Sequence, residues 1–187
     1  PDPPISVRPP RNRSGMSKSA NKSTGTPATV ALARTGLPHT LHPYVHDPRS
    51  RYFGEEAAAA LHVDPARVFK TLVVELTSGP EPLVTAVIPA DNHLDLKQIA
   101  ALSKAKRAAL ADPAVAQRVT GFVRGGISPL GQKRQTPVII DQSAAAAPTI
   151  FVSGGRRGLS VEMAPDDLVR ATHGRLGTIS RPGLHWS

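Results

Sequence analysis

The ten-residue stretch GGISPLGQKR, residues 125–134, contains residue types that could do chemistry. Its second and third glycines, Gly126 and Gly131, have the separation found in a Walker A phosphate-binding loop. The residue that should be lysine is Gln132, however, and Arg134 replaces the serine or threonine that would hold magnesium. Pro129 also removes a backbone N–H from a loop whose purpose would be to offer N–H groups. The loop is therefore glycine-rich but is not built to hold ATP in that way.

A second glycine-rich stretch, SGGRRG, covers residues 153–158. Each glycine pair, 125–126 and 154–155, follows a segment that we expect to be extended. Such loops can direct several N–H groups at one oxygen atom, as an oxyanion hole does, although they can also be simple tight turns. Because arginines and lysines lie within or beside both loops, the loops are also candidates for binding phosphate.

Lys70 is a third candidate, because it lies in the middle of a predicted strand over residues 68–76. With a period of two, it shares a strand face with Val68, Leu72 and Val74. An ammonium group on an apolar face is unfavourable unless the face opens onto a cleft or a partner. Lys70 is therefore either a site lysine or a side chain that extends past the strand edge into water.

Metal and serine chemistry receive less support from the sequence. His39, His42 and His46 lie in a segment with two prolines and lack the spacing of a helical metal site, and the chain has no cysteine. We therefore predict neither a metal nor another cofactor. Ser128 does not lie in a complete GxSxG nucleophile elbow, so it is a weak candidate for a nucleophile.

The elements that must position these residues alternate irregularly between helix and strand. Capping residues, glycine stops and apolar periodicity predict helices over 26–36, 55–63, 94–103, 112–121 and 165–174. Strand patterns predict extended segments over 39–45, 68–76, 82–90, 122–127, 137–141, 149–152 and 159–163. Because strict βαβ alternation is lacking, we predict a mixed α/β (α+β) domain with a mixed sheet and flanking helices, and no Rossmann fold.

Length and charge bound the remaining possibilities. The chain has 187 residues and a formal net charge of +9, which suits one domain with an anionic partner, nucleic acid being the first candidate. Residues 1–25 read as a disordered basic tail or an artificial extension, residues 26–178 as the folded domain, and residues 179–187 as a C-terminal tail. No apolar run approaches the roughly 20 residues of a membrane span. We therefore expect a cytoplasmic protein with no membrane contact.

Four blocks of the sequence, in this order, resemble the YbaK-type Cys-tRNA(Pro) deacylases of the prolyl-tRNA-editing superfamily. The blocks are YVHDP, YFGEEAAAALHVDPARVFKTLVV, GGISPLGQKR and VSGGRRGLSVEMAPDDL. The resemblance implies a curved mixed sheet and a trans-editing hydrolase that removes cysteine from tRNA(Pro), with prolyl-tRNA synthetase as a partner. It also implies that the cysteine thiol of the substrate attacks its own ester and leaves as a cyclic thiolactone.

Carried over motif by motif, the resemblance assigns roles to individual positions. Its catalytic residues fall on Lys70, Gly125 and Gly126. Its substrate-binding residues fall on Tyr44, Phe53, Thr71, Ser128, Pro129, Gly131, Ser153, Gly154, Gly155, Arg157 and Gly158. The glycine loop would then hold the terminal adenosine and aminoacyl ester of a tRNA. Two alternatives stay open, namely a tRNA- or synthetase-binding module without catalysis, and a deacylase for another aminoacyl-tRNA or ester.

Overall fold

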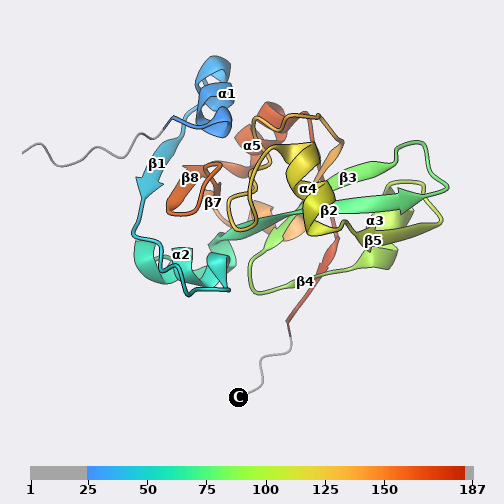
Figure 1. Cartoon of the computed structure of the whole chain (residues 1–187), viewed down its shortest axis with the longest axis horizontal. Coiled ribbons are helices and arrows are strands. Elements are labelled where there is room, and N and C mark those ends of the chain that lie inside the picture. The colour runs from blue at the N-terminus through green and yellow to red at the C-terminus, as the bar shows by residue number, and fades with distance from the viewer. Residues whose placement is uncertain (1–24, 184–187) are drawn as a thin grey trace, which may run out of the picture.

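The computed structural model describes residues 25–183 (Figure 1), so the predicted N-terminal tail up to residue 24 and the last four residues lie outside the described part. The helices are α1 (Pro27–Thr35), α2 (Phe53–Leu61), α3 (Leu96–Leu102), α4 (Pro113–Thr120) and α5 (Pro165–Thr172), with short 3-10 helices η1 (Pro65–Arg67) and η2 (Gln142–Ala146). The strands are β1 (Thr40–Pro43), β2 (Phe69–Thr77), β3 (Leu83–Pro89), β4 (His93–Leu94), β5 (Arg107–Leu110), β6 (Val138–Asp141), β7 (Ile150–Ser153), β8 (Leu159–Met163), β9 (Arg175–Gly177) and β10 (Ser180–Arg181).

The strands form one mixed sheet of five strands, an antiparallel sheet of three, and a two-stranded pair. In the large sheet the order is β5-β2-β3-β6-β9, with antiparallel pairing from β5 to β3 and parallel pairing from β3 to β9. The three-stranded sheet has the order β1-β8-β7. A parallel bridge between Val68 and Phe151 joins the start of β2 to β7, so the two larger sheets meet at a seam. The predicted mixed α/β class is confirmed.

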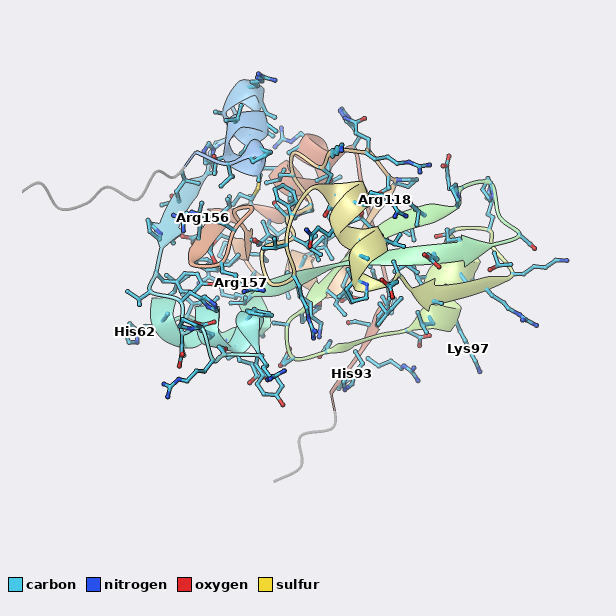
Figure 2. The ribbon with its side chains drawn as sticks, in the orientation of Figure 1. His62, His93, Lys97, Arg118, Arg156 and Arg157 are labelled. Atoms are coloured by element: carbon cyan, nitrogen blue, oxygen red, sulfur yellow. The ribbon has the colours of Figure 1, made fainter. Side chains whose placement is uncertain are left out.

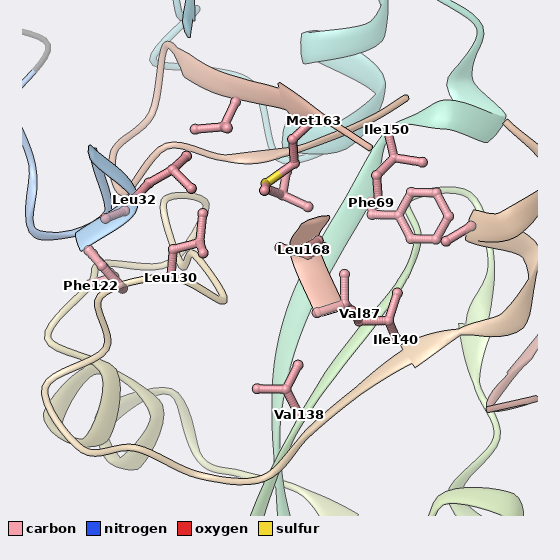
Figure 3. Close-up of a cluster of buried hydrophobic side chains, with 14 residues drawn as sticks. Leu32, Phe69, Val87, Phe122, Leu130, Val138, Ile140, Ile150, Met163 and Leu168 are labelled. Atoms are coloured by element: carbon pink, nitrogen blue, oxygen red, sulfur yellow. The ribbon is translucent and has the colours of Figure 1, made fainter. Parts of the chain in front are cut away.

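Two buried clusters cover the two faces of the large sheet. All seven residues of β3 are buried, with Val87 in one cluster and Val84, Ala86 and Ile88 in the other. The cluster around Val87 extends to Leu168 of α5 and to Leu32 of α1, which places both helices over the region where the sheets meet (Figure 3). The sheet that carries Lys70 is therefore a rigid base for a site.

Helix ends follow the sequence signals where a capping side chain or glycine is present. Thr26 caps α1, its hydroxyl accepting a hydrogen bond from the Thr29 N–H at 3.1 Å, and the helix ends at Gly36 with φ +68°. Helix α4 begins after Asp112 and ends at Gly121 in the same conformation. Helix α3 is shorter than predicted, because Asp95 caps it and residues 93–94 pair with β10 instead.

The strand predicted over 122–127 is wrong, because these residues form a loop in the structure. Gly125 has φ +82°, and the Gly126 N–H donates to the Val123 carbonyl at 2.9 Å, which closes a tight turn. The extended pattern FVR ends at this turn, with Val123 and Arg124 exposed. The left-handed conformation of Gly125 is incompatible with a continuing strand.

The predicted domain boundary at residue 178 is too early. Ile179 is fully buried, and its N–H donates to the Asp141 carboxylate at 3.0 Å. Strand β10 then pairs with β4. These contacts place residues 179–181 in the packed body. Within residues 25–183, no helix is long and apolar enough to cross a membrane.

Candidate active site

A cavity of about 420 Å³ lies at the seam between the two larger sheets. Its walls come from the N-terminal half of α2, the first residues of β2, the loop before Ser128, and strands β7 and β8. Six of the predicted site residues line it, namely Tyr44, Phe53, Lys70, Thr71, Gly125 and Ser153. Segments that are far apart in the sequence therefore converge on one site.

Lys70 lines the cavity, as its neighbours Thr71 and Leu72 of β2 do, and it pairs with Ile88 of β3 in the ladder. Its Nζ donates to the Ala90 carbonyl at 2.9 Å and to the Asn92 carbonyl at 2.5 Å. Burial lowers the pKa of the Lys70 ammonium, while the carboxylates of Asp91 and Glu55 act in the opposite direction. An ammonium group has three N–H donors, so two hold the side chain in place and one remains for a ligand.

Phe53 and Gly125 fit together in a way that requires glycine. A Cβ on Gly125 would lie 2.7–2.8 Å from three carbon atoms of the Phe53 ring. The Arg157 guanidinium lies 5.0 Å from the centroid of the same ring. Phe53 is thus held between the first glycine loop and the second, and one reason for glycine at 125 is the close approach of this ring.

The two glycine loops also contact each other directly. Arg157 Nε donates to the Arg124 carbonyl at 2.8 Å, and a Cβ on Gly126 would lie 2.9 Å from the Arg156 Cα. Figure 2 shows Arg156 and Arg157 on the β7–β8 hairpin, with Arg157 on the side of α2. The loops form one unit at the end of the cavity.

Several glycine N–H groups are already engaged within this unit. Gly126 donates to the Val123 carbonyl, Gly154 to the Leu159 carbonyl at 2.8 Å, and Gly155 to Ser153 Oγ at 3.2 Å. Within the described part of the chain, the Gly125 N–H has no protein acceptor. Of the predicted catalytic glycines, Gly125 is consequently better placed than Gly126 to donate to a substrate oxygen.

Hydroxyl groups supply the polar character of the cavity. Thr71 is 7% exposed, and its Oγ1 has no hydrogen-bond partner among residues 25–183. Ser160 lines the same cavity and is also buried. Burial raises the pKa of the Tyr44 phenol, which stays a proton donor near neutral pH. A buried hydroxyl without a partner is unfavourable, so Thr71 is a candidate ligand contact.

The other predicted site residues lie beside or behind the cavity wall, and Arg157 among them is exposed. Ser128 is fully buried, and its Oγ accepts the Leu130 N–H at 3.2 Å. A Cβ on Gly131 would lie 2.2 Å from the Pro27 carbonyl oxygen, so this glycine lets α1 pack on the loop. Eight predicted residues do not line the cavity: Gly126, Ser128, Pro129, Gly131, Gly154, Gly155, Arg157 and Gly158. The contacts of Gly126, Gly131 and Arg157 are with neighbouring loops and with the Phe53 ring.

Several residues that line the cavity have no role predicted from the sequence. These are Arg51, Tyr52, Glu55, Arg124 and Ser160. Arg51 and Tyr52 directly precede Phe53, and Arg124 directly precedes Gly125, so adjacency to assigned residues was the available signal. Ser160 pairs with Ser153 across the β7–β8 hairpin, which only the strand register reveals.

The histidines considered as metal ligands take part in other interactions. His42 Nε2 lies 2.8 Å from a Glu162 carboxylate oxygen, and His46 Nδ1 lies 3.0 Å from the Glu56 carboxylate. His39 Nδ1 lies 2.8 Å from the Leu37 carbonyl. Among residues 25–183, no three His, Cys, Asp or Glu side chains are grouped so that they could hold a metal ion.

Fold and cavity together define a mixed α/β protein whose site offers a cation, hydroxyl groups and a glycine loop. Comparison with known protein families shows to which family the chain belongs. Residues 49–171 match the model described as the aminoacyl-tRNA editing domain, and the chain belongs to that family. The matched region includes Phe53, Lys70 and both glycine loops. Members of this class are deacylases that act on aminoacyl-tRNA, and this chain is one of them.

Individual proteins agree with this assignment. The chain is 38% identical over 127 residues, 67% of its length and 76% of the other's, to the "Putative Cys-tRNA(Pro)/Cys-tRNA(Cys) deacylase EbsC" of Enterococcus faecalis. Its fold matches the protein APE2540 with a TM-score of 0.73 at 23% identity, covering 83% of this chain and all of the other. It also matches a "putative trans-editing enzyme for prolyl tRNA synthetase" with a TM-score of 0.68 at 22% identity, covering 82% of this chain and 92% of the other.

Proposed function

We propose that this protein is a trans-editing deacylase that removes cysteine from mischarged tRNA(Pro). The relative from Enterococcus faecalis carries that activity in its name, and the structural neighbour is described as acting for prolyl-tRNA synthetase. In this proposal the cavity holds the aminoacyl ester. Selection of tRNA(Pro) comes from joint action with prolyl-tRNA synthetase in the cytoplasm, where tRNA is charged.

The observation that carries the proposal is the absence of an activated nucleophile from the cavity wall. Among residues 25–183 the wall has serine, threonine and tyrosine hydroxyls but no histidine, and the full sequence contains no cysteine. Glu55 is the one carboxylate among the lining residues of the described chain. A serine hydroxyl without a neighbouring base is a poor nucleophile at neutral pH.

A substrate thiol removes the need for a protein nucleophile. A cysteine thiol has a pKa near ~8.5, so it ionises far more readily than a hydroxyl. Its sulfur forms a bond to its own ester carbonyl carbon, the bond to the ribose oxygen breaks, and the proton lost by the thiol ends on that oxygen. The products are free tRNA and a cyclic thiolactone.

The protein contributes position and charge to this step. Lys70 has one N–H left for the oxygen that becomes negative, and the Gly125 N–H is a second donor at the same cavity. Donors placed in advance around a developing oxyanion lower the barrier without forming a covalent bond to the substrate. Thr71 supplies a buried hydroxyl for the aminoacyl group.

Release of radiolabelled amino acid from three charged tRNAs tests the proposal. Cys-tRNA(Pro) should be cleared much faster than Ser-tRNA(Pro), and S-methyl-Cys-tRNA(Pro) should bind but not react. Equal turnover of the cysteine and serine substrates would show that the thiol is not the nucleophile. Turnover of none of them, with tRNA still bound, would favour a binding module without catalysis.

A further inference from the structure

Exposed apolar side chains occur in and next to the segments that form the cavity, and the proposed chemistry does not use them. Among residues 25–183 five large hydrophobic side chains are exposed, and three belong to segments that form the cavity. Tyr52 lines it and is 72% exposed, Val45 follows Tyr44 and is 91% exposed, and Val123 precedes Arg124. Single exposed apolar residues are ordinary, but Tyr52 is an exposed aromatic ring that also lines the cavity, and a ligand that enters the cavity would cover it.

Tyr52 has a fixed backbone and a free ring. It occupies the position before the first residue of α2, and its carbonyl accepts the Glu56 N–H at 2.9 Å. The next residue, Phe53, is held between Gly125 and Arg157. A rigidly mounted aromatic ring that faces solvent loses little conformational entropy when a second flat group stacks on it.

The charges beside this ring are mostly positive. Arg51 and Arg124 are exposed and line the cavity together with Lys70, whereas Glu55 is the one acidic residue on the described wall. An aromatic platform combined with cations is how proteins bind single-stranded nucleic acid, since bases stack on the ring and phosphates pair with the cations.

The size of the cavity indicates which part of a tRNA would lie on this rim. A volume of about 420 Å³ is in the range that encloses one small-molecule-sized group. The cavity can enclose an aminoacyl ester with its ribose. It is too small to enclose the neighbouring unpaired nucleotides of the acceptor end as well. Those nucleotides must therefore lie outside, against the rim.

We propose that Tyr52, Arg51 and Arg124 form a binding site for the unpaired 3′ end of the tRNA. One base next to the terminal nucleotide stacks on the Tyr52 ring, and the two guanidinium groups contact the phosphates on either side of it. This inference rests on the proposed function. It assigns binding of the common single-stranded end to the deacylase itself, separately from any recognition of the tRNA body by a synthetase.

Equilibrium binding of uncharged tRNA(Pro), with and without its three 3′-terminal nucleotides, tests the site. Tyr52→Ala should weaken binding of the intact tRNA roughly 5- to 100-fold, whereas Tyr52→Phe keeps the ring and should bind like wild type. On the shortened tRNA, Tyr52→Ala and wild type should bind equally. The thermal midpoint of Tyr52→Ala should not change, because the side chain is 72% exposed.

Arg124→Ala is compared with Arg107→Ala, which also removes one exposed positive charge. Arg107 of β5 lies opposite Thr77 in the strand ladder, and Thr77 is at the other end of β2 from Lys70. Arg124→Ala should weaken binding of the intact tRNA more than of the shortened one, whereas Arg107→Ala should affect both equally. The same result for both arginines would show that only general charge attraction is involved.

Three results would overturn the site: unchanged binding by Tyr52→Ala, equal weakening by Tyr52→Phe, or the same loss on the shortened tRNA. Deacylation by the wild-type protein separates this failure from failure of the proposed function. If the wild type deacylates Cys-tRNA(Pro) and Tyr52→Ala has an unchanged KM, only the binding site is wrong. If the wild type deacylates no aminoacyl-tRNA, the proposed function itself is wrong.

Discussion

Replacing Gly125 by alanine should damage the protein in two separable ways. The first is backbone strain, because an alanine at φ +82° costs about 1–2 kcal/mol relative to glycine. The second is a collision, because the new Cβ would lie 2.7–2.8 Å from the Phe53 ring. Overpacking of this kind typically costs about 1–3 kcal/mol. We expect Gly125→Ala to lower the free energy of unfolding by about 2–5 kcal/mol.

Gly36→Ala is the matched control for the strain. Gly36 ends α1 with φ +68°, and a Cβ there would meet nothing within 4 Å. This substitution should therefore show only the first cost. Denaturant unfolding measures both variants, and the difference between them, about 1–3 kcal/mol, reports the collision with Phe53.

A double substitution completes the test. Removing the ring in Phe53→Ala should abolish the extra cost of Gly125→Ala, because the ring atoms that collide with the new Cβ are absent. Equal unfolding free energies for Gly125→Ala and Gly36→Ala would refute the reasoning. Activity should fall in Gly125→Ala even if the Gly125 N–H takes no part in catalysis, because a displaced Phe53 changes the cavity. Loss of activity alone therefore does not identify an oxyanion donor.

Four further results are expected. Lys70→Met should lower kcat for Cys-tRNA(Pro) about 10²- to 10³-fold while the circular dichroism spectrum stays unchanged, and near-full activity would remove Lys70 from the site. Because burial lowers the pKa of Lys70, wild type should gain stability relative to Lys70→Met as pH rises from that lowered pKa toward ~10.4, measured by denaturant unfolding. The hydrogen bond from the Thr149 hydroxyl, followed by the contacts with His42 and Arg67, lowers the pKa of Glu162. The ionised carboxylate therefore stabilises the fold above pH ~4.3, and this stability is lost as the pH falls through the lowered pKa of the folded state. Glu162→Gln should reduce this loss of thermal midpoint at acid pH, measured in thermal melts. Deacylation should survive incubation with EDTA, and loss of activity that zinc restores would show that a metal is needed.

The sequence was most informative where one residue has a strong local preference. Helix α1 was predicted correctly because Thr26, Pro27 and Gly36 each favour one end of a helix. Lys70 was singled out because a charge interrupts an apolar strand face, and the structure places it on the cavity wall. Its two carbonyl acceptors, in Ala90 and Asn92, could not be predicted, because they follow a different strand.

The parts that could not be predicted depend on long-range packing. The glycine pair 125–126 looked like the end of a strand, but its conformation is fixed by Phe53 and Arg156 from elsewhere in the chain. Ser160 has no local signal at all, and its position at the cavity follows from its register opposite Ser153. The sequence pattern predicts both loops, but only the fold separates the residues that line the cavity from those that support it.

The pairing of β1 with β8 has a consequence for how the protein is made. His42 and Glu162 contact each other across 120 residues of chain, and the segment after β1 carries Tyr44 into the cavity. A ribosome that adds about 5–20 residues per second needs several seconds between synthesising these two strands. During that time the mixed sheet can begin to form, but the cavity lacks Tyr44 and the β7–β8 wall. A nascent or prematurely terminated chain therefore has no complete site, so deacylation begins only when nearly the whole domain has left the ribosome.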